Sequence, residues 1–255
     1  MSGPSPIMDP TILPLASDFH KGSGRAVIFV VAALLGSLST GLAQQNNTVR
    51  SPVGAEDVVG TLVGGALFLT PHVFDIHDHP PACAPCDPSR VSWFDRWAVA
   101  TPRAAWSDAS TVMAGGLVLA TWWDLAHQGR TGISGIAASV QTASLAVGAT
   151  EVLKALIARK RPVLYTAQAI AAARDLDNQR SLPSGHTTGA FAIATSYWLE
   201  TGRLGRRDWK AWAAMAAAAG VGVLRVAGAE HFPSDVMAGA AVGVASSVLV
   251  YKFRF

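Results

Sequence analysis

Apolar residues of this chain gather in long runs, and polar or proline-containing segments separate one run from the next. None of the runs shows the strict alternation of a half-buried strand, and their lengths favour helices. The pattern therefore predicts an all-α protein. After a polar segment from Gln44 to Asp57, six runs follow: Val58 to Phe74, Ala109 to Ala126, Ile133 to Ala158, Thr187 to Leu199, Trp209 to Ala229 and Val236 to Phe253.

The N-terminal region has the order of a targeting segment. Lys21 and Arg25 precede a charge-free run, and small residues follow it as far as Ala43, as in a secretory signal. The run is short for a spanning helix, which needs about 20 apolar residues, but an uncleaved first span fits the same residues. We therefore expect residues 1–43 to be a signal cleaved at Ala43 or an extra hydrophobic segment, and residues 44–255 to form the functional domain.

The charges between the runs favour a membrane protein. In a six-span layout, three basic connections fall on one side, as the positive-inside rule requires of the cytoplasm. Asp124, Gln141 and Glu151 interrupt the runs, so helices of a soluble exported protein remain the alternative. An additional N-terminal span would invert the orientation of the later six. The basic residues are Arg130, then Arg203, Arg206, Arg207 and Lys210, and finally Lys252 and Arg254.

Composition narrows the class further. Of the 255 residues, 50% are hydrophobic and only 15% are charged, and the net charge is +3. These values exclude intrinsic disorder and a coiled coil, and the dispersed basic residues predict no nucleic-acid partner. Cys83 and Cys86 lie in a proline-rich segment and most simply form one short disulfide. With His77 and His79 just upstream, a zinc clip is the weaker alternative.

Two short motifs contain residues that suit an anion site. Lys154 lies inside an apolar run, where an ionisable side chain is costly and usually functional. Arg161 follows it by about two helical turns, so both side chains would project from one face if the helix continued, and Pro162 ends that helix soon after. Further on, residues 183–186 (Pro-Ser-Gly-His) precede an apolar run. They predict a helix start whose free amides attract phosphate oxygens.

A third motif adds an oriented imidazole. Pro233 suits the first turn of the last helix, so Asp235 would lie in that turn and accept a hydrogen bond from the ring of His231 just before it. Such a ring presents its other nitrogen as a base or nucleophile. Alone, each motif could be a capped or basic helix end. Together with Lys154, Arg161 and Arg225 they suit phosphoryl transfer, in which negative charge spreads over three oxygens.

These residues resemble the three-part signature of the type 2 phosphatidic acid phosphatases (the PAP2 superfamily), which class A acid phosphatases and vanadium haloperoxidases share. The match runs from Lys154 to Asp235, and one position departs from it, because Leu224 stands where the family has Ser. The resemblance implies an all-α, six-helix transmembrane bundle of the PAP2 or acid phosphatase–haloperoxidase type. The matching residues are Lys154, Arg161 and Pro162, then Pro183 to His186, then Arg225, His231 and Asp235.

The resemblance also implies roles for individual residues. His231 would be the nucleophile that forms a phosphohistidine, Asp235 would orient it, and His186 would be the general acid. The phosphoryl oxygens would be bound by Lys154, Arg161, Ser184, Gly185 and Arg225. The same family mechanism implies no metal and no cofactor.

We therefore expect a metal-independent phosphatase acting on a lipid phosphate monoester or pyrophosphate at the outer face of a bacterial inner membrane. The runner-up is a soluble periplasmic phosphatase acting on small organic phosphates, and a haloperoxidase fits so short and apolar a chain poorly. A catalytically silent membrane protein would keep the helices but need none of the motifs. The sequence contains no decisive signal for the identity of the lipid or for the oligomeric state.

Overall fold

The computed structural model describes residues 52–74, 83–206 and 208–255. The predicted N-terminal segment of residues 1–43, its cleavage at Ala43, and both histidines of the possible zinc clip lie outside these residues.

Every regular element in the described part of the chain is helical, so the all-α class is confirmed. Each predicted apolar run coincides with one long helix, although three of the runs extend one or two residues past the end of their helix. The short helix α5 (Ala169–Ala172) is added between the first two motifs. The predicted count of six helices is therefore not confirmed. The long helices are α2 (Ala55–Val73), α3 (Ala104–Ala126), α4 (Arg130–Ile157), α6 (Gly185–Arg203), α7 (Trp209–Ala227) and α8 (Pro233–Arg254).

The number of membrane spans also differs from the prediction. Among the described residues, three helices are long and apolar enough to cross a membrane by length and composition, namely α4, α7 and α8. Polar residues that interrupt the apolar runs have partners inside the protein. The Asp124 carboxylate on α3 accepts hydrogen bonds from the Tyr197 hydroxyl (2.9 Å) and from Lys210 Nζ (2.5 Å). The Gln141 amide donates to the carbonyl of Glu56 across α2 and α4 (3.0 Å).

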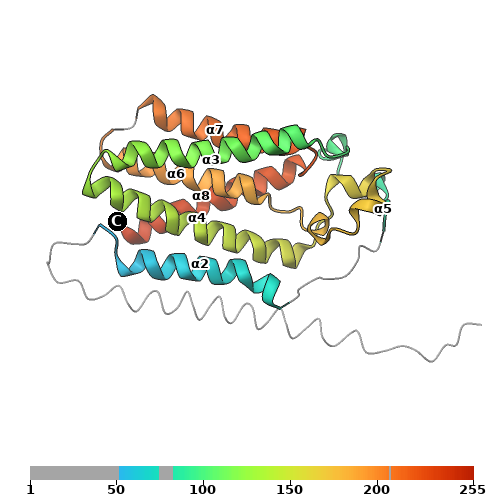
Figure 1. Ribbon diagram of the computed structural model, residues 1–255, viewed down its shortest axis with the longest axis horizontal. Helices are drawn as coiled ribbons and strands as arrows, with labels where there is room; N and C mark the ends of the chain where they lie inside the picture. The colour runs from blue at the N-terminus through green and yellow to red at the C-terminus, as the bar shows by residue number, and fades with distance from the viewer. Residues whose placement is uncertain (1–51, 75–82, 207) are drawn as a thin grey trace, which may run out of the picture. The chain divides into compact units, whose positions relative to one another are not determined.

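Helix α6 is the centre of the packing, because it contacts α3, α4, α7 and α8, while α2 packs on α4 (Figure 1). Glycines on α8 bring its backbone against that of α6. A Cβ on Gly239 would lie 2.6 Å from the Ser184 carbonyl oxygen, and a Cβ on Gly243 would lie 2.5 Å from that of Thr188. Such close approach is typical of helix pairs with small residues at their interface. It places the start of α6 beside the start of α8, where the second and third motifs lie.

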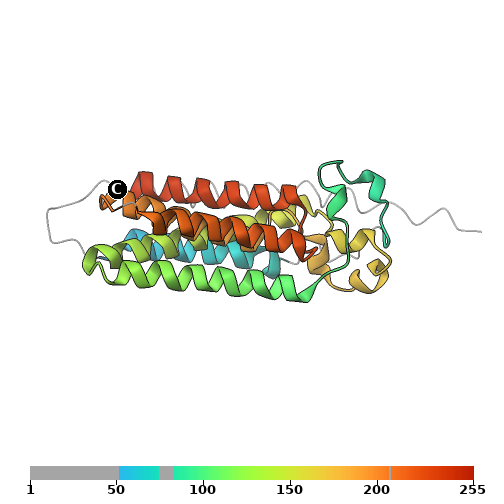
Figure 2. The same cartoon turned by 90° about the horizontal axis from the view of Figure 1, so that it is seen from above.

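The connections between the long helices lie at the two ends of this helical bundle. In both views the C-terminus lies at one end, and α5 with residues 83–99 lies at the other (Figures 1 and 2). The turns from α3 to α4 and from α6 to α7 share the end of the C-terminus, where Arg254 pairs with Asp57. The basic connections therefore gather at the end opposite to the three motifs. Four short 3-10 helices complete the fold: η2 (Pro88–Arg90), η3 (Arg96–Ala98), η4 (Pro162–Tyr165) and η5 (Leu176–Gln179).

Candidate active site

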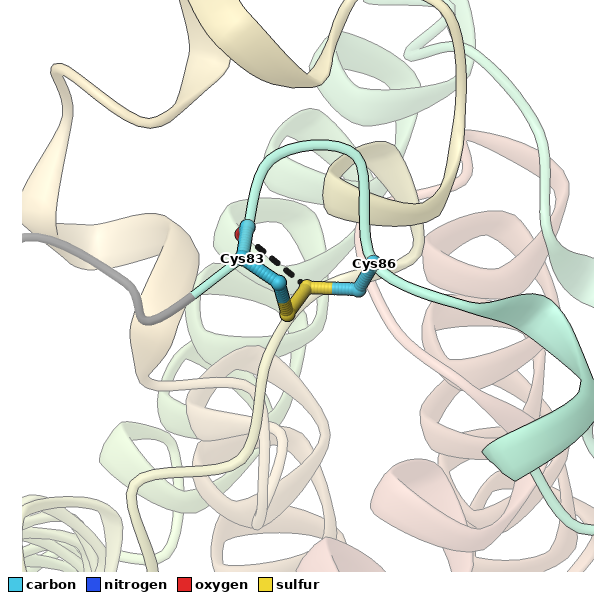
Figure 3. The surroundings of a disulfide bond; sticks show 2 residues. All are labelled: Cys83 and Cys86. Carbon is cyan, nitrogen blue, oxygen red and sulfur yellow. Dashed lines mark hydrogen bonds between the residues drawn. A yellow bond between two sulfur atoms is a disulfide. The ribbon is translucent and has the colours of Figure 1, made fainter. Parts of the chain in front are cut away.

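The cysteine loop is anchored beside the motifs. Cys83 and Cys86 form a disulfide that closes a short loop (Figure 3), as the simpler prediction had it. Both sulfurs are used in this bond, so the alternative of a zinc clip is wrong for this structure. The amide of Cys86 donates to the carbonyl of Leu164 (2.8 Å), and Cys86 packs with Val163 and Leu164 of η4. The loop thereby contacts the segment that follows Arg161.

His231 is held with one ring nitrogen free. Its side chain is only 2% exposed, and Nδ1 lies 2.8 Å from the carbonyl oxygen of Ser181. Because a carbonyl oxygen only accepts, Nδ1 carries the proton and the neutral ring keeps its lone pair on Nε2. Burial lowers the pKa of His231 to about 4, and the charges of Arg161 and Arg225 act in the same direction. The ring is therefore neutral near pH 7, as a nucleophile must be.

Asp235 acts on His231 through an intermediate residue. Its Oδ2 lies 3.8 Å from His231 Nδ1, too far for the direct hydrogen bond that we expected. That oxygen instead accepts from the Ser181 hydroxyl (2.5 Å) and from the Phe232 amide (2.8 Å), while Oδ1 accepts from Arg159 Nη1 (2.5 Å). Asp235 thus fixes Ser181, whose carbonyl orients the imidazole.

Arg159 and Asp95 support this carboxylate, and no sequence pattern pointed to either residue. Asp95 is 2% exposed and accepts from Arg159 Nη2 (2.8 Å) and from the amide and hydroxyl of Ser234 (3.0 and 2.7 Å). Burial alone would raise the pKa of Asp95, but the hydrogen bonds from Ser234 and Arg159 outweigh it and the pKa is lowered. Arg159 therefore bridges two buried carboxylates, Asp95 and Asp235.

We expect Asp95→Asn to lower the free energy of unfolding by about 1–3 kcal/mol, because it removes charge-assisted acceptors from buried donors. Chemical unfolding in detergent measures this loss. Asp108→Asn is the matched control, since Asp108 is exposed on α3 and should change the stability by less than about 0.5 kcal/mol. Equal stability of the two variants would show that the buried network contributes little.

Arg161, which immediately precedes η4, and Arg225 of α7 meet at one acceptor. Arg161 Nη1 and Arg225 Nη2 lie 2.9 Å and 3.4 Å from the same oxygen, Oε2 of Glu230. Arg225 is 4% exposed, and its Nη1 also donates to the hydroxyl of Ser107 (2.9 Å). The Nε atoms of Arg161 and Arg225 are buried without a hydrogen-bond partner among the described residues. Buried donors without acceptors are rare in folded proteins, and these two would suit the oxygens of an anionic ligand.

The start of α6 supplies further donors. Ser184 is the N-cap residue of α6, and its hydroxyl oxygen accepts from the Thr187 hydroxyl (3.0 Å) instead of capping the helix. The amides of Gly185 and His186 have no acceptor within the described part of the chain, as is typical of helix starts that bind anions. A Cβ on Gly185 would lie 3.4 Å from Lys154 Nζ, so the absence of a side chain there lets the ammonium group approach.

His186 lies at the mouth of an apolar groove. The groove has a volume of about 480 Å³, and α3, α4 and α6 line it with apolar and small side chains, among them Val118, Trp122 and Ile193. His186 is exposed, and its Nε2 lies 3.2 Å from the Thr111 hydroxyl at the same end of the groove.

The charges of the three predicted cations act on the His186 ring. Desolvation and then the charges of Arg225, Lys154 and Arg161 lower the pKa of His186 to about 4. A dianionic phosphoryl group bound among these cations would act in the opposite direction and favour the protonated ring.

The low pKa of His231 has a consequence for stability. The folded-state pKa of about 4 lies below the ordinary 6.5, so between these values the unfolded chain binds a proton that the native protein does not. Stability from this source is present above pH 6.5 and is lost as the pH falls toward 4. We therefore expect His231→Gln to show a smaller fall in Tm than the wild type over this range. An identical fall in both proteins would contradict the assigned pKa.

Comparison with known proteins agrees with these observations. The family model described as the PAP2 superfamily matches residues 134–255. The chain is also similar to the lipid A 1-phosphatase of Porphyromonas gingivalis, with 44% identity over 71 residues, which is 28% of this chain and 16% of that protein. The chain thus covers only a small part of that relative. No solved structure matches this chain. The C-terminal part of the chain, residues 134–255, therefore belongs to the PAP2 superfamily.

Proposed function

We propose that this protein is a phosphatase that hydrolyses a lipid phosphate monoester or pyrophosphate through a phosphohistidine at His231. One observation carries the proposal. Arg161 and Arg225 converge on one oxygen and keep unpaired Nε donors, while the charges of both arginines act on the buried ring of His231. This arrangement suits a phosphoryl group with several anionic oxygens, attacked by a neutral imidazole.

The reaction has two steps in this proposal. His231 Nε2 attacks phosphorus, the bond from phosphorus to the leaving oxygen breaks, and His186 donates a proton to that oxygen. Water then attacks the phosphohistidine, and His186 accepts the proton of that water, so that inorganic phosphate leaves and both rings return to their first state. Lys154, Arg161, Arg225 and the amides at the start of α6 stabilise the charge on the transferred group.

The apolar groove supports a lipid substrate. Its mouth holds His186, the proposed proton donor to the leaving group, so the leaving alcohol would lie beside the groove. An aliphatic chain in an apolar groove gains about 0.8 kcal/mol for each methylene removed from water. The similarity to a lipid A 1-phosphatase points to the same class of substrate. Phosphatidate, phosphatidylglycerophosphate, undecaprenyl pyrophosphate and lipid A are the candidates to compare.

The charge distribution supports an extracytoplasmic site in a bacterial inner membrane. The basic connections lie at the end of the bundle opposite to the motifs, and basic ends of membrane proteins face the cytoplasm. The disulfide near the motifs suits an oxidising compartment.

The test is phosphate release in detergent from the candidate lipids and from a soluble ester, with and without EDTA. We expect release from at least one lipid at a rate that EDTA does not change, because the cations described above replace a metal in stabilising the phosphoryl group. A strict requirement for magnesium would overturn the metal-independent mechanism.

Fractionation of cells decides between the two phosphatase candidates. Activity that stays with the membranes and needs detergent for release supports the lipid phosphatase. Activity set free by osmotic shock alone would favour the soluble periplasmic enzyme.

A further inference from the structure

The apolar groove beside His186 has a definite length. Its wall on α3 is one row of residues spaced three or four apart, which is one face of the helix. Trp122 ends this row and follows Thr111, which contacts His186, by eleven residues, or about 16 Å of helix. On α6 the wall runs from His186 to Ile193, about 10 Å. The row on α3 consists of Thr111, Ala114, Gly115, Val118 and Trp122.

Trp122 closes the end of the groove that is distant from the motifs. Its indole Nε1 donates to the Ser139 hydroxyl on α4 (2.8 Å), so the side chain crosses from α3 to the neighbouring helix. Ser139 immediately precedes Val140, the groove residue on α4 that lies farthest from the motifs, because α4 runs toward them. Trp122 also packs against the hydrophobic core of the bundle. The indole is therefore a fixed boundary.

We propose that Trp122 determines how much of a substrate's aliphatic chain the groove accepts. The inference rests on the proposed phosphatase function and adds a chain-length preference to it. An extended chain advances about 1.2 Å per bond, as the extended peptide backbone does, so a groove of about 10 to 16 Å takes roughly eight to thirteen carbons. Carbons beyond Trp122 leave the groove and add nothing to binding.

The space before Trp122 suits one such chain. The groove volume of about 480 Å³ holds roughly 16 groups of the size of a water molecule, at about 30 Å³ each. Methylene groups are close to this size, so two chains of that length would not fit. Between Thr111 and His186 at the mouth and Trp122 at the end, the lining residues have no polar side chain. An aliphatic chain there displaces no side-chain hydrogen bond.

Gly115 gives a way to shorten the groove without disturbing the helices. It lies about 6 Å along α3 from Thr111, or roughly five carbons from the mouth, and a Cβ added to it would meet nothing within 4 Å. A leucine at this position would therefore occupy the groove. It would also favour the helix, because leucine is a better helix former than glycine.

The test measures binding of n-alkylphosphonates of about four to sixteen carbons, which keep an anionic head group but have no phosphate ester to hydrolyse. Titration calorimetry on the detergent-solubilised full chain gives a Kd for each length. The measured quantity is the ratio of Kd between a variant and the wild type at each length, because partition of the ligand into detergent is the same for both proteins and cancels. Inorganic phosphate is the ligand without a chain.

The two variants should change this ratio in opposite directions. For Gly115→Leu we expect a ratio near one with the butyl ligand and binding at least about tenfold weaker from about eight carbons upward, because each excluded methylene contributes up to about fourfold. Trp122→Ala should match the wild type up to about eight carbons and bind the sixteen-carbon ligand about tenfold more tightly. Trp122→Phe keeps most of the volume and loses only the bond to Ser139, so it should resemble the wild type throughout.

Trp123→Ala is the matched control, because Trp123 is the next residue of α3, is 72% exposed and does not line the groove; it should change no ratio. A Gly115→Leu ratio that is the same at every length, or a folded Trp122→Ala protein with no gain for long ligands, would overturn the proposal. If Trp122→Ala does not fold, Gly115→Leu decides alone.

Failure of the proposal is distinguishable from failure of the phosphatase function. A wild type that binds neither inorganic phosphate nor the butyl ligand would contradict the phosphoryl site itself. A wild type that binds phosphate, with variants whose ratios do not depend on chain length, would contradict only the role of Trp122.

Discussion

His231→Ala is expected to lower phosphate release from every substrate by at least about a thousandfold, because it removes the proposed nucleophile and leaves only binding and charge stabilisation. The ring is buried, its Nδ1 is held by the Ser181 carbonyl, and its Nε2 has the lone pair. Phosphate release in detergent measures the loss, at substrate concentrations that saturate the wild type.

Two controls separate this effect from damage to the fold. His127→Ala removes an exposed histidine at the far end of α3 and should leave activity within about twofold of the wild type. The His231→Ala protein should still bind inorganic phosphate, since Arg161 and Arg225 remain. An active His231→Ala protein would support the reading of the chain as a membrane protein that needs none of the motifs.

The second large effect concerns His186. His186→Ala should lower the rate on a lipid phosphate by about 100- to 10,000-fold, because an alkoxide leaves slowly without a proton. The same variant should hydrolyse a nitrophenyl phosphate at close to the wild-type rate, because a nitrophenolate leaves without protonation. This expectation applies when cleavage of the bond from phosphorus to the leaving oxygen is rate-limiting. The ratio of the two rates in each protein is the measurement, and phosphate release from both esters supplies it.

His231→Ala provides the contrast, because it should lose activity on both esters alike. If His186→Ala slows the two esters equally, His186 does not act as the general acid. It would then serve only to bind substrate at the mouth of the groove, next to the hydroxyl of Thr111.

Most of the helical positions could be predicted from the sequence alone. Each of the six apolar runs matches one long helix to within two residues at its C-terminal end or lies inside it, and two prolines indicated correct boundaries. Pro162 begins η4 after α4 has ended, and Pro233 is the first residue of α8. The number of spans could not be predicted in the same way, because apolar and small residues also form buried protein contacts. Gly239 and Gly243 pack against α6 rather than against lipid.

The motifs identified which residues gather at one end of the bundle, but not how they are held. The sequence patterns did not identify Ser181, Asp95 or Glu230. Ser181 and Asp95 act through contacts with residues distant in the sequence. Glu230 lies in a turn whose geometry no periodicity reveals. The direct bond from Asp235 to His231 was expected from a spacing of one helical turn. The carbonyl of Ser181 occupies that position instead, and sequence spacing says nothing about such a backbone group.

In the proposed mechanism the phosphoryl group passes through the imidazole of His231. The most direct test is to quench the wild-type enzyme during turnover of a phosphate-labelled lipid, under alkaline conditions that preserve phosphohistidine, and to map the label by mass spectrometry. The expected result is an alkali-stable, acid-labile phosphoryl group on His231. A label on any other residue, or turnover with inversion at phosphorus and no covalent label, would contradict it.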